Sequence, residues 1–378
     1  MRGPSLFSRL RGILRRTCWP IVPLVGVILL FSFFVQWSVS PDLALPSGHI
    51  LRIGALGFFA AAAFLLSAKK WRAQAYLFYA AVLMPLIWVL IAGRATNGSR
   101  RWIDLFGGFK LQPSEFMKVA VILVLARWFA DHPKPSRLSD LIKPGLLVAV
   151  PAMLILVEPD LGTALVFVPL FLCMAWLAGL PWRRFRWLLL LPALLAPIGW
   201  LAIQDYQKER ILTWWHQNEL SPEEIANEGW HLHHAKLAVG SGGLTGFGFG
   251  QGPENRLGLL PERHNDFVFP VIAEEYGFFG AVGFLLLYAS LGITLLAYAA
   301  RYRDPFARYT LAGVGIHFLV HLSLNVGVTL GVWPTTGLPL PMISFGGSSM
   351  MASGLALGLA VVVGATRAPL FSSRAFEA

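Results

Sequence analysis

Ten long apolar runs limit what this chain of 378 residues can fold into. An α-helix needs about 20 predominantly apolar residues to cross the hydrocarbon core of a membrane. A helix also satisfies its own backbone hydrogen bonds, as a segment in hydrocarbon must. The runs predict spans near residues 19–37, 50–67, 75–92, 114–130, 141–157, 161–179, 186–204, 268–300, 308–332 and 343–366. We therefore expect an all-α polytopic membrane protein with ten transmembrane helices.

The composition supports a membrane protein. Hydrophobic residues make up 56% of the chain and charged residues 13%, and the mean hydropathy is +0.61. The charged fraction is about half that of a typical soluble protein. The net charge of +11 could suggest a nucleic-acid partner, but the basic residues stand in short clusters between apolar runs. We expect no nucleic acid as a partner, and we expect membrane lipid headgroups to attract many of these residues.

Lys and Arg clusters predict the orientation of the chain. Alternate loops carry such clusters, as at Lys69, Lys70 and Arg72, and the positive-inside rule makes that side cytoplasmic. Four segments follow: a cytoplasmic N-terminal segment at 1–18, a single membrane domain at 19–366, a large outer loop at 205–267 between the seventh and eighth spans, and a cytoplasmic C-terminal tail at 367–378. Both termini are expected inside.

Glu115 and Lys118 are the first candidate functional residues. They stand three positions apart, on one face of the span near 114–130 and at its outer end. An ionisable group inside a span indicates a functional site by default. A structural ion pair that locks helices together explains the two residues equally well.

Glu158 and Asp160 flank Pro159 in a tight outer turn between two apolar runs. Asp160 can cap the helix that follows, and capping accounts for one carboxylate there but not for two. We also expect Asp160 to reach Lys118 from the neighbouring helix.

The stretch LPERHNDFVF places Glu262, Arg263, His264 and Asp266 directly before an apolar run. Asp266, at the boundary between membrane and water, suits a general base whose pKa is raised by partial burial. Its position fits an N-cap of the next helix slightly better. His264 is either a hydrogen-bond partner of Asp266 or an ordinary interface residue. Glu262 and Arg263 alone could be a solvated ion pair.

Basic residues on the outer side run against the orientation rule and need a separate reason. They are Arg94, Arg100, Arg101, Lys110, Lys236 and Arg263. An arginine guanidinium binds phosphate through two N–H groups, so a lipid diphosphate in the outer leaflet is one such reason. Ordinary headgroup attraction is the alternative for any single residue.

Two further motifs in the outer loop carry less weight. His231, His233 and His234 could bind a metal, but no carboxylate or cysteine completes a recognisable ligand pattern. The run GSGGLTGFGFGQG lacks the ending of a nucleotide-binding loop, which favours a tight re-entrant turn, and no nucleotide is expected.

Several motifs in a fixed order give a resemblance to a known family. They are GSRRWIDLFGGFKLQPSEFMK, EPDLGTAL, KLAVGSGGL, LLPERHNDFVFPVIAEEYGFFG and GLPLPMISFGGSS. The chain resembles the SEDS family (shape, elongation, division and sporulation), which includes RodA, FtsW and SpoVE, and it is most similar to RodA. It departs from the family where His234 and Ala235 replace a usual Gln-Ser pair and where Asn265 replaces a usual Thr.

The resemblance implies a multi-pass glycosyltransferase of the bacterial cytoplasmic (inner) membrane. Such an enzyme polymerises lipid II into β-1,4-linked peptidoglycan strands at the outer face, here for cell-wall elongation and rod shape. The essential aspartate of the family maps onto Asp266, and its cavity residues map onto Glu115, Lys118 and Asp160. The implied partners are a class B penicillin-binding protein transpeptidase, the nascent glycan strand and other proteins of the elongation complex.

The expected reaction is an inverting displacement in which Asp266 takes the proton of a sugar hydroxyl. Arg101 and Lys118 would stabilise the departing diphosphate, with Lys236, Arg263 and His264 as further candidates. A divalent cation, Mg²⁺ or Mn²⁺, could share that task and could be held partly by Asp266, although no sequence pattern specifies it. Two other functions remain open, a lipid II flippase and a non-catalytic scaffold of the cell-wall synthesis complex.

Overall fold

The computed structural model describes residues 20–40, 43–93, 101–104, 110–227 and 229–365, except for four side chains of α8 at 192, 195, 198 and 202. Arg94, Arg100 and the predicted terminal segments 1–18 and 367–378 lie outside this range. Apart from connecting loops, the described chain is helical except for a short antiparallel hairpin, β1 (Ile103–Asp104) and β2 (Lys110–Leu111). This confirms the all-α fold class.

A helix lies at the position of each predicted span. The helices are α2 (Ile21–Ser38), α3 (Ser47–Ala62) continued by η2 (Ala63–Leu65), α4 (Ala68–Ala92), α5 (Pro113–Asp131), α6 (Ile142–Val157) preceded by η4 (Leu138–Leu141), α7 (Leu161–Leu177), α8 (Trp182–Ala202), α13 (Val268–Arg301), α14 (Pro305–Thr329) and α15 (Gly347–Gly364). Within the described residues, seven helices are long and apolar enough to cross a membrane, and α7 is apolar but shorter. The protein is therefore a multi-pass membrane protein, and the count of ten spans stays a prediction.

Local sequence explains where several of these helices begin. Ser67 caps α4 by accepting a hydrogen bond from the Lys70 amide, and Asp304 caps α14 through the Ala307 amide. Pro113 occupies the first turn of α5, where its missing N–H removes no hydrogen bond.

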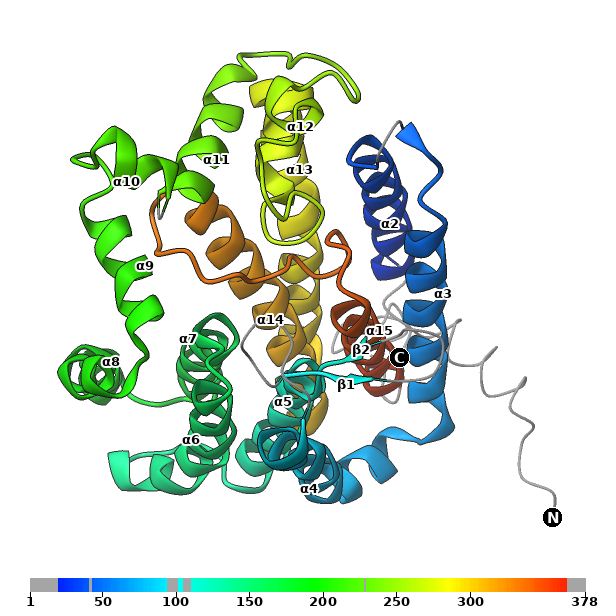
Figure 1. Cartoon of the computed structure of the whole chain (residues 1–378). Coiled ribbons are helices and arrows are strands. Elements are labelled where there is room, and N and C mark those ends of the chain that lie inside the picture. Colours follow the sequence, from blue (N-terminus) through cyan, green and yellow to red (C-terminus); the bar gives the residue numbers. More distant parts are fainter. Residues whose placement is uncertain (1–19, 41–42, 94–100, 105–109, 228, 366–378) are drawn as a thin grey trace.

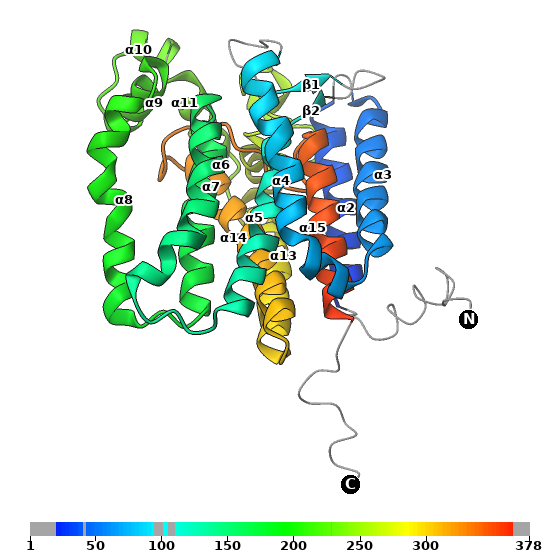
Figure 2. The same ribbon diagram turned by 90° about the horizontal axis from the view of Figure 1, so that it is seen from below.

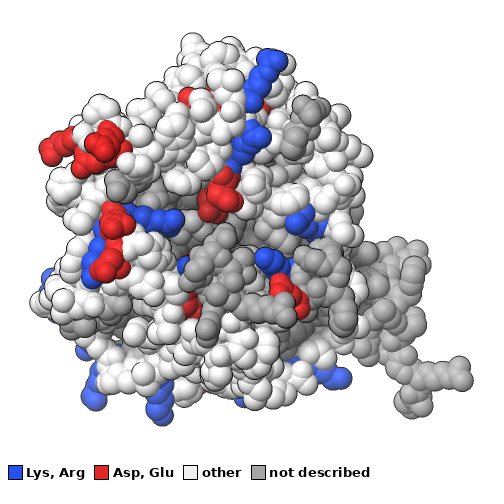
Figure 3. Space-filling view, in the orientation of Figure 1, with Lys and Arg blue, Asp and Glu red and all other residues white. Residues whose placement is uncertain are grey.

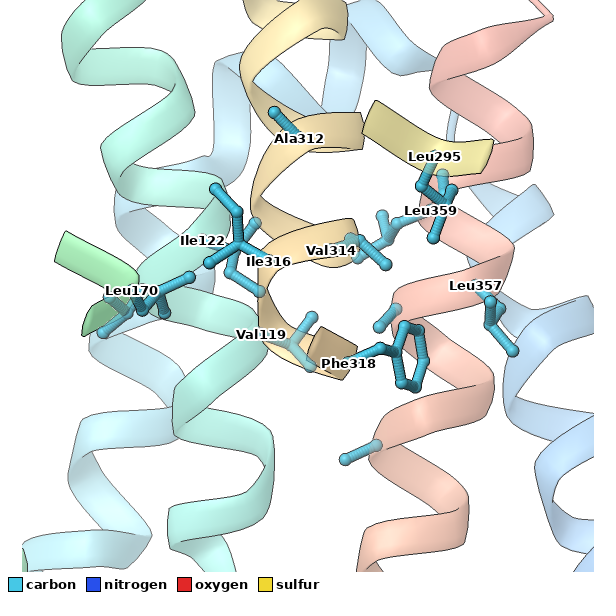
Figure 4. Packing of buried hydrophobic residues seen from close by; sticks show 14 of the residues in the cluster. Val119, Ile122, Leu170, Leu295, Ala312, Val314, Ile316, Phe318, Leu357 and Leu359 are labelled. Carbon is cyan, nitrogen blue, oxygen red and sulfur yellow. The ribbon is translucent and has the colours of Figure 1, made fainter. Parts of the chain in front are cut away.

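The core lies between α5, α13, α14 and α15, and Figure 4 shows apolar side chains from these helices and from α7 meeting there. Small residues allow α15 to approach α3 closely. A Cβ atom added at Gly354 would lie 2.2 Å from the Leu56 carbonyl oxygen, and one at Gly358 would lie 2.3 Å from that of Ala60. Close backbone approach at small residues is a common way to pack helices in a membrane.

Four shorter helices gather with the β hairpin at one end of the bundle (Figures 1 and 2). They are α9 (Asp205–Trp215), α10 (Pro222–Ala226), α11 (Trp230–Ser241) and α12 (Pro253–Arg256). We call this end the outer end, following the predicted orientation. The opposite end is marked by the hydrogen bond from the Tyr302 hydroxyl, after α13, to the Gly364 carbonyl of α15.

Helix α13 is broken near its outer end at Gly277, whose φ of 66° and ψ of −166° are not helical. The Gly-rich segment folds into a tight turn against this break. The amides of Phe247 and Gly248 donate to the carbonyls of Glu274 and Glu275 at 3.1 and 2.9 Å. The turn thus satisfies carbonyl groups that the break leaves without a helical partner.

Candidate active site

A cavity of about 550 Å³ opens at the outer end of the bundle and contains Asp266 in its wall. Its lining comes from five separate segments: Arg101 and Trp102; Pro159 and Leu161; Gln204, Tyr206, Gln207, Arg210 and Ile211; Asp266; and Pro334, Thr335, Thr336 and Gly337. Figure 3 looks onto this end, where basic and acidic side chains lie close together around a hollow. The cavity therefore combines one carboxylate of the predicted site with basic groups from other parts of the chain.

The surroundings of Asp266 suit a general base. Burial raises the pKa of this carboxyl to about 7, and the nearby carboxylates of Glu262 and Asp160 add to the rise. Arg210 and Arg101 oppose it. A carboxyl with a pKa near neutral is partly ionised at physiological pH and can accept a proton from a reacting hydroxyl.

The N-cap interpretation of Asp266 is wrong. Phe267 is the N-cap residue of α13, and no side chain caps that helix. The carboxylate of Asp266 instead faces the chain after α14, since a Cβ atom added at Gly337 would lie 3.3 Å from its Oδ2. The backbone carbonyl of Asp266 accepts a hydrogen bond of 2.9 Å from the Asn325 side chain.

Arg101 is fixed against the turn between α6 and α7. Its Nε donates to the Glu158 carbonyl at 2.8 Å, and its guanidinium also donates to the Pro159 carbonyl. The Tyr206 hydroxyl of α9 donates to that same Pro159 carbonyl at 2.6 Å. The side chain of Arg101 remains 24% exposed, so its charge stays open to the cavity.

Asp160 caps α7, as the sequence predicted. Its Oδ1 accepts from the Thr163 amide at 3.1 Å, and its Oδ2 accepts from the Thr163 hydroxyl and from the Gln112 side chain. Burial raises the pKa of the neighbouring Glu158 carboxyl to about 8, with a further rise from Asp160. Asp160 is thus a structural group at the edge of the cavity.

The expected contact between Asp160 and Lys118 is wrong. Lys118 pairs with Glu115 at 2.7 Å, and its Nζ lies 3.2 Å from Nε2 of His321 on α14. These three side chains are buried between α5 and α14. The geometry therefore favours the structural ion pair that locks helices together, one of the two interpretations of Glu115 and Lys118.

Three other candidate residues lie outside the lining of the Asp266 cavity. Lys236 donates to Gln217 Oε1 at 2.5 Å and joins α11 to the segment after α9, and burial lowers its pKa. Arg263 and His264 line a separate cavity of about 470 Å³ that also contains Glu262. Of the two interpretations of His264, the hydrogen bond to Asp266 is not formed, and Nε2 of its ring instead lies 3.8 Å from Oε2 of Glu262.

Sequence reasoning missed the contribution of α9, which brings Tyr206, Gln207 and Arg210 to the cavity. Arg210 is another basic residue in the outer loop, so the argument from the orientation rule would have found it. Asn325 gave no such signal, because a single amide in an apolar helix is compatible with many roles.

The described residues do not form a resident metal site. Among them, no three His, Cys, Asp or Glu side chains lie close enough together to hold a metal ion. His234 of the histidine-rich segment instead bonds Glu254, with its Nδ1 2.6 Å from Oε2.

The fold and the cavity define a class of polytopic membrane protein in which charged groups from several helices converge at the outer end of the bundle. The family described as cell cycle proteins, comprising FtsW, RodA and SpoVE, matches residues 14–368. The chain belongs to this family.

Individual relatives agree with this assignment. The chain is 33% identical over 350 residues to the peptidoglycan glycosyltransferase MrdB of Escherichia coli K12, covering 92% of this chain and 93% of the relative. It is 36% identical to a probable peptidoglycan glycosyltransferase FtsW of Thiomicrospira cyclica, covering 82% and 80%. The RodA structure from Thermus thermophilus is 34% identical, with a TM-score of 0.66 over 91% of this chain and 95% of that one. A chain of a peptidoglycan synthase complex, also 34% identical, gives a TM-score of 0.76 over 91% and 96%.

Proposed function

We propose that this chain is a peptidoglycan glycosyltransferase that polymerises lipid II into β-1,4-linked strands at the outer face of the membrane. The names of its relatives support this activity. The observation that carries the proposal is the placement of Asp266, with its raised pKa, in one cavity with Arg101 and Arg210. An inverting transfer from a sugar diphosphate needs a base for the attacking hydroxyl and positive charge beside the departing diphosphate, and the cavity offers both.

The proposed reaction is a single displacement. Asp266 removes the proton from the 4-hydroxyl of the acceptor sugar, and that oxygen forms a bond to the anomeric carbon of the donor. The bond from this carbon to the diphosphate breaks, and the diphosphate leaves with the electron pair. Attack from the opposite side converts an α-linked donor into a β-linked product. General base catalysis of this kind contributes about 10²–10⁴-fold in rate.

Arg101 and Arg210 are proposed to hold the departing diphosphate. An arginine fork forms two parallel hydrogen bonds with phosphate oxygens, and donors that are already fixed need no reorganisation during the reaction. The Glu158 and Pro159 carbonyls orient Arg101 in this way. Lys118 is no longer needed for this role, because its ammonium group is buried against Glu115 and His321.

The setting of this activity is part of the proposal. A multi-pass protein of the bacterial cytoplasmic membrane, with both termini inside, presents the Asp266 cavity to the outer leaflet. The similar chain within a peptidoglycan synthase complex supports a class B penicillin-binding protein as partner. The similarity to RodA and MrdB supports a role in elongation.

Polymerisation of lipid II by the purified protein with its partner transpeptidase tests the proposal. Asp266→Asn should abolish polymer formation, whereas Asp205→Asn should not, because Asp205 is an exposed carboxylate at the start of α9. Full polymerisation by the Asp266→Asn protein, with other glycosyltransferases excluded, would rule out this role for Asp266. Movement of labelled lipid II across vesicle membranes without any polymerisation by the unaltered protein would favour the flippase instead.

A further inference from the structure

Helix α14 carries a buried polar stripe that the proposed reaction does not use. His317, His321 and Asn325 stand four positions apart, so they share one face of the helix. All three are buried, with exposures of 3%, 0% and 2%. Polar side chains at such positions in an apolar helix require partners, and those partners show what the stripe does.

Asn325 connects Asp266 to the segment after α14. Its Nδ2 donates to the Asp266 carbonyl at 2.9 Å and to the Leu338 carbonyl at 2.8 Å. Leu338 follows Gly337, the residue that lies against the Asp266 carboxylate. One amide group therefore fixes the backbone of the proposed base and the backbone that faces its side chain.

His321 extends this connection to the ion pair in the membrane span. Its Nδ1 lies 3.3 Å from the Pro339 carbonyl, next to the residue that Asn325 holds. Its Nε2 lies 3.2 Å from Nζ of Lys118, which is paired with Glu115. The stripe thus links the buried pair on α5 to the wall of the Asp266 cavity.

We propose that Asn325 is a positioning residue for Asp266, with His321 and the Glu115–Lys118 pair holding the adjoining segment in register. This inference rests on the proposed function of Asp266 as base. Misplacement of a reacting group by about 1 Å costs on the order of 10²-fold in rate, so two hydrogen bonds to the flanking backbone are enough to control turnover.

The first test compares Asn325→Ala with Thr310→Val. Thr310 is a buried residue of α14 whose hydroxyl donates to the Phe306 carbonyl of the same helix, so it controls for the loss of a buried polar side chain. Asn325→Ala should lower kcat for lipid II polymerisation by about 10²-fold with little change in KM, whereas Thr310→Val should leave both unchanged. Equal rates in the two variants would overturn the proposal.

The pH profile separates positioning from a loss of folded protein. Asp266 is surrounded by the carboxylates of Glu262 and Asp160 and the guanidinium groups of Arg210 and Arg101. In the Asn325→Ala protein, Asp266 should be held less firmly, so that water reaches its carboxyl group and lowers its pKa. The acidic limb of the rate profile should then move to lower pH. A mere loss of folded protein lowers the rate equally at every pH, and an unmoved limb would contradict the inference.

A thiol probe gives an answer that does not depend on polymerisation. In a protein carrying Asp266→Cys, with Cys18 and Cys173 changed to Ser, the rate of alkylation against pH reports the pKa of the introduced thiol. Adding Asn325→Ala should lower that pKa, because the loosened segment admits water, and Thr310→Val should leave it unchanged. An identical titration in all three proteins would refute the positioning role even if Asp266 proves not to be the base.

Discussion

Two groups of charged side chains, similar in composition, occupy different surroundings in this protein. Glu115 and Lys118 pair at 2.7 Å, with side chains 4% and 0% exposed. In the outer cavity, Nη1 of Arg101 lies 3.9 Å from Oδ2 of Asp160, and Arg101 remains 24% exposed. The first group satisfies its charges within the bundle. The second keeps its charges open to a ligand.

After the complete loss expected for Asp266→Asn, the largest effect on activity is expected from the cations of the cavity. Arg101→Gln and Arg210→Gln should each lower the polymerisation rate by about 10²–10³-fold, because each removes a donor aimed at the departing diphosphate. Thermal stability in detergent should change little for Arg210, which is exposed. As a control, Arg256→Gln alters a basic residue of the outer loop that lies outside this cavity. Equal losses in all three variants would mean that only general surface charge matters.

The largest effect on stability is expected from the internal pair. Lys118→Met leaves the buried Glu115 carboxylate without its cation, which typically costs about 3–5 kcal/mol. The melting temperature should fall, and adding Glu115→Gln should restore most of it. The exposed pair of Arg72 with Asp131 gives the comparison, since breaking it should cost about 0–1 kcal/mol. If the Lys118 variant melts normally yet cannot polymerise lipid II, Lys118 belongs to the reacting site after all.

A smaller effect should follow from Gly337→Ala. The φ of Gly337 is 66°, and the added Cβ would lie 3.3 Å from Oδ2 of Asp266. Placing an alanine at such a φ costs about 1–2 kcal/mol in backbone strain alone. Gly258→Ala measures this strain separately, because Gly258 has a φ of 70° and open space around it. Both variants should lose similar stability, and Gly337→Ala should also lose about tenfold in rate. Similar polymerisation rates in the two variants would show that a methyl group beside the Asp266 carboxylate does not disturb the reaction.

The sequence was sufficient for the long helices and for naming Asp266 as a candidate. Long apolar runs predicted the ten long helices of the described chain. The position of Asp266 directly before such a run slightly favoured an N-cap, and the family resemblance singled it out as the proposed base. Helix α8 begins at Trp182 rather than near 186, because exposed arginines in its first turns can extend their charged ends to the interface without breaking the helix. That run of arginines hid the true start of the helix from a hydropathy argument.

The part of the site that the sequence could not predict consists of contacts between distant segments of the chain. Spacing placed Lys118 on the same face as Glu115, but it could not show how α5 is rotated against α7 and α14, so the contact with Asp160 was wrong. Likewise, Asn325 and Asp266 are 59 positions apart, and only packing of α14 beside the start of α13 brings them together. Helical periodicity shows which residues share one face of a helix, but it does not show which neighbouring helix packs against that face.

The pH dependence of lipid II polymerisation by the purified protein tests the central claim most directly. Asp266 must be ionised to accept a proton, and its pKa is raised to about 7. The rate should therefore fall as pH falls through 7, by about fivefold between pH 7 and pH 6. Asp266→Asn should remove the activity across the whole range. An acidic limb near pH 4, where an ordinary aspartate titrates, or a limb that persists in an active Asp266→Asn protein, would contradict the account.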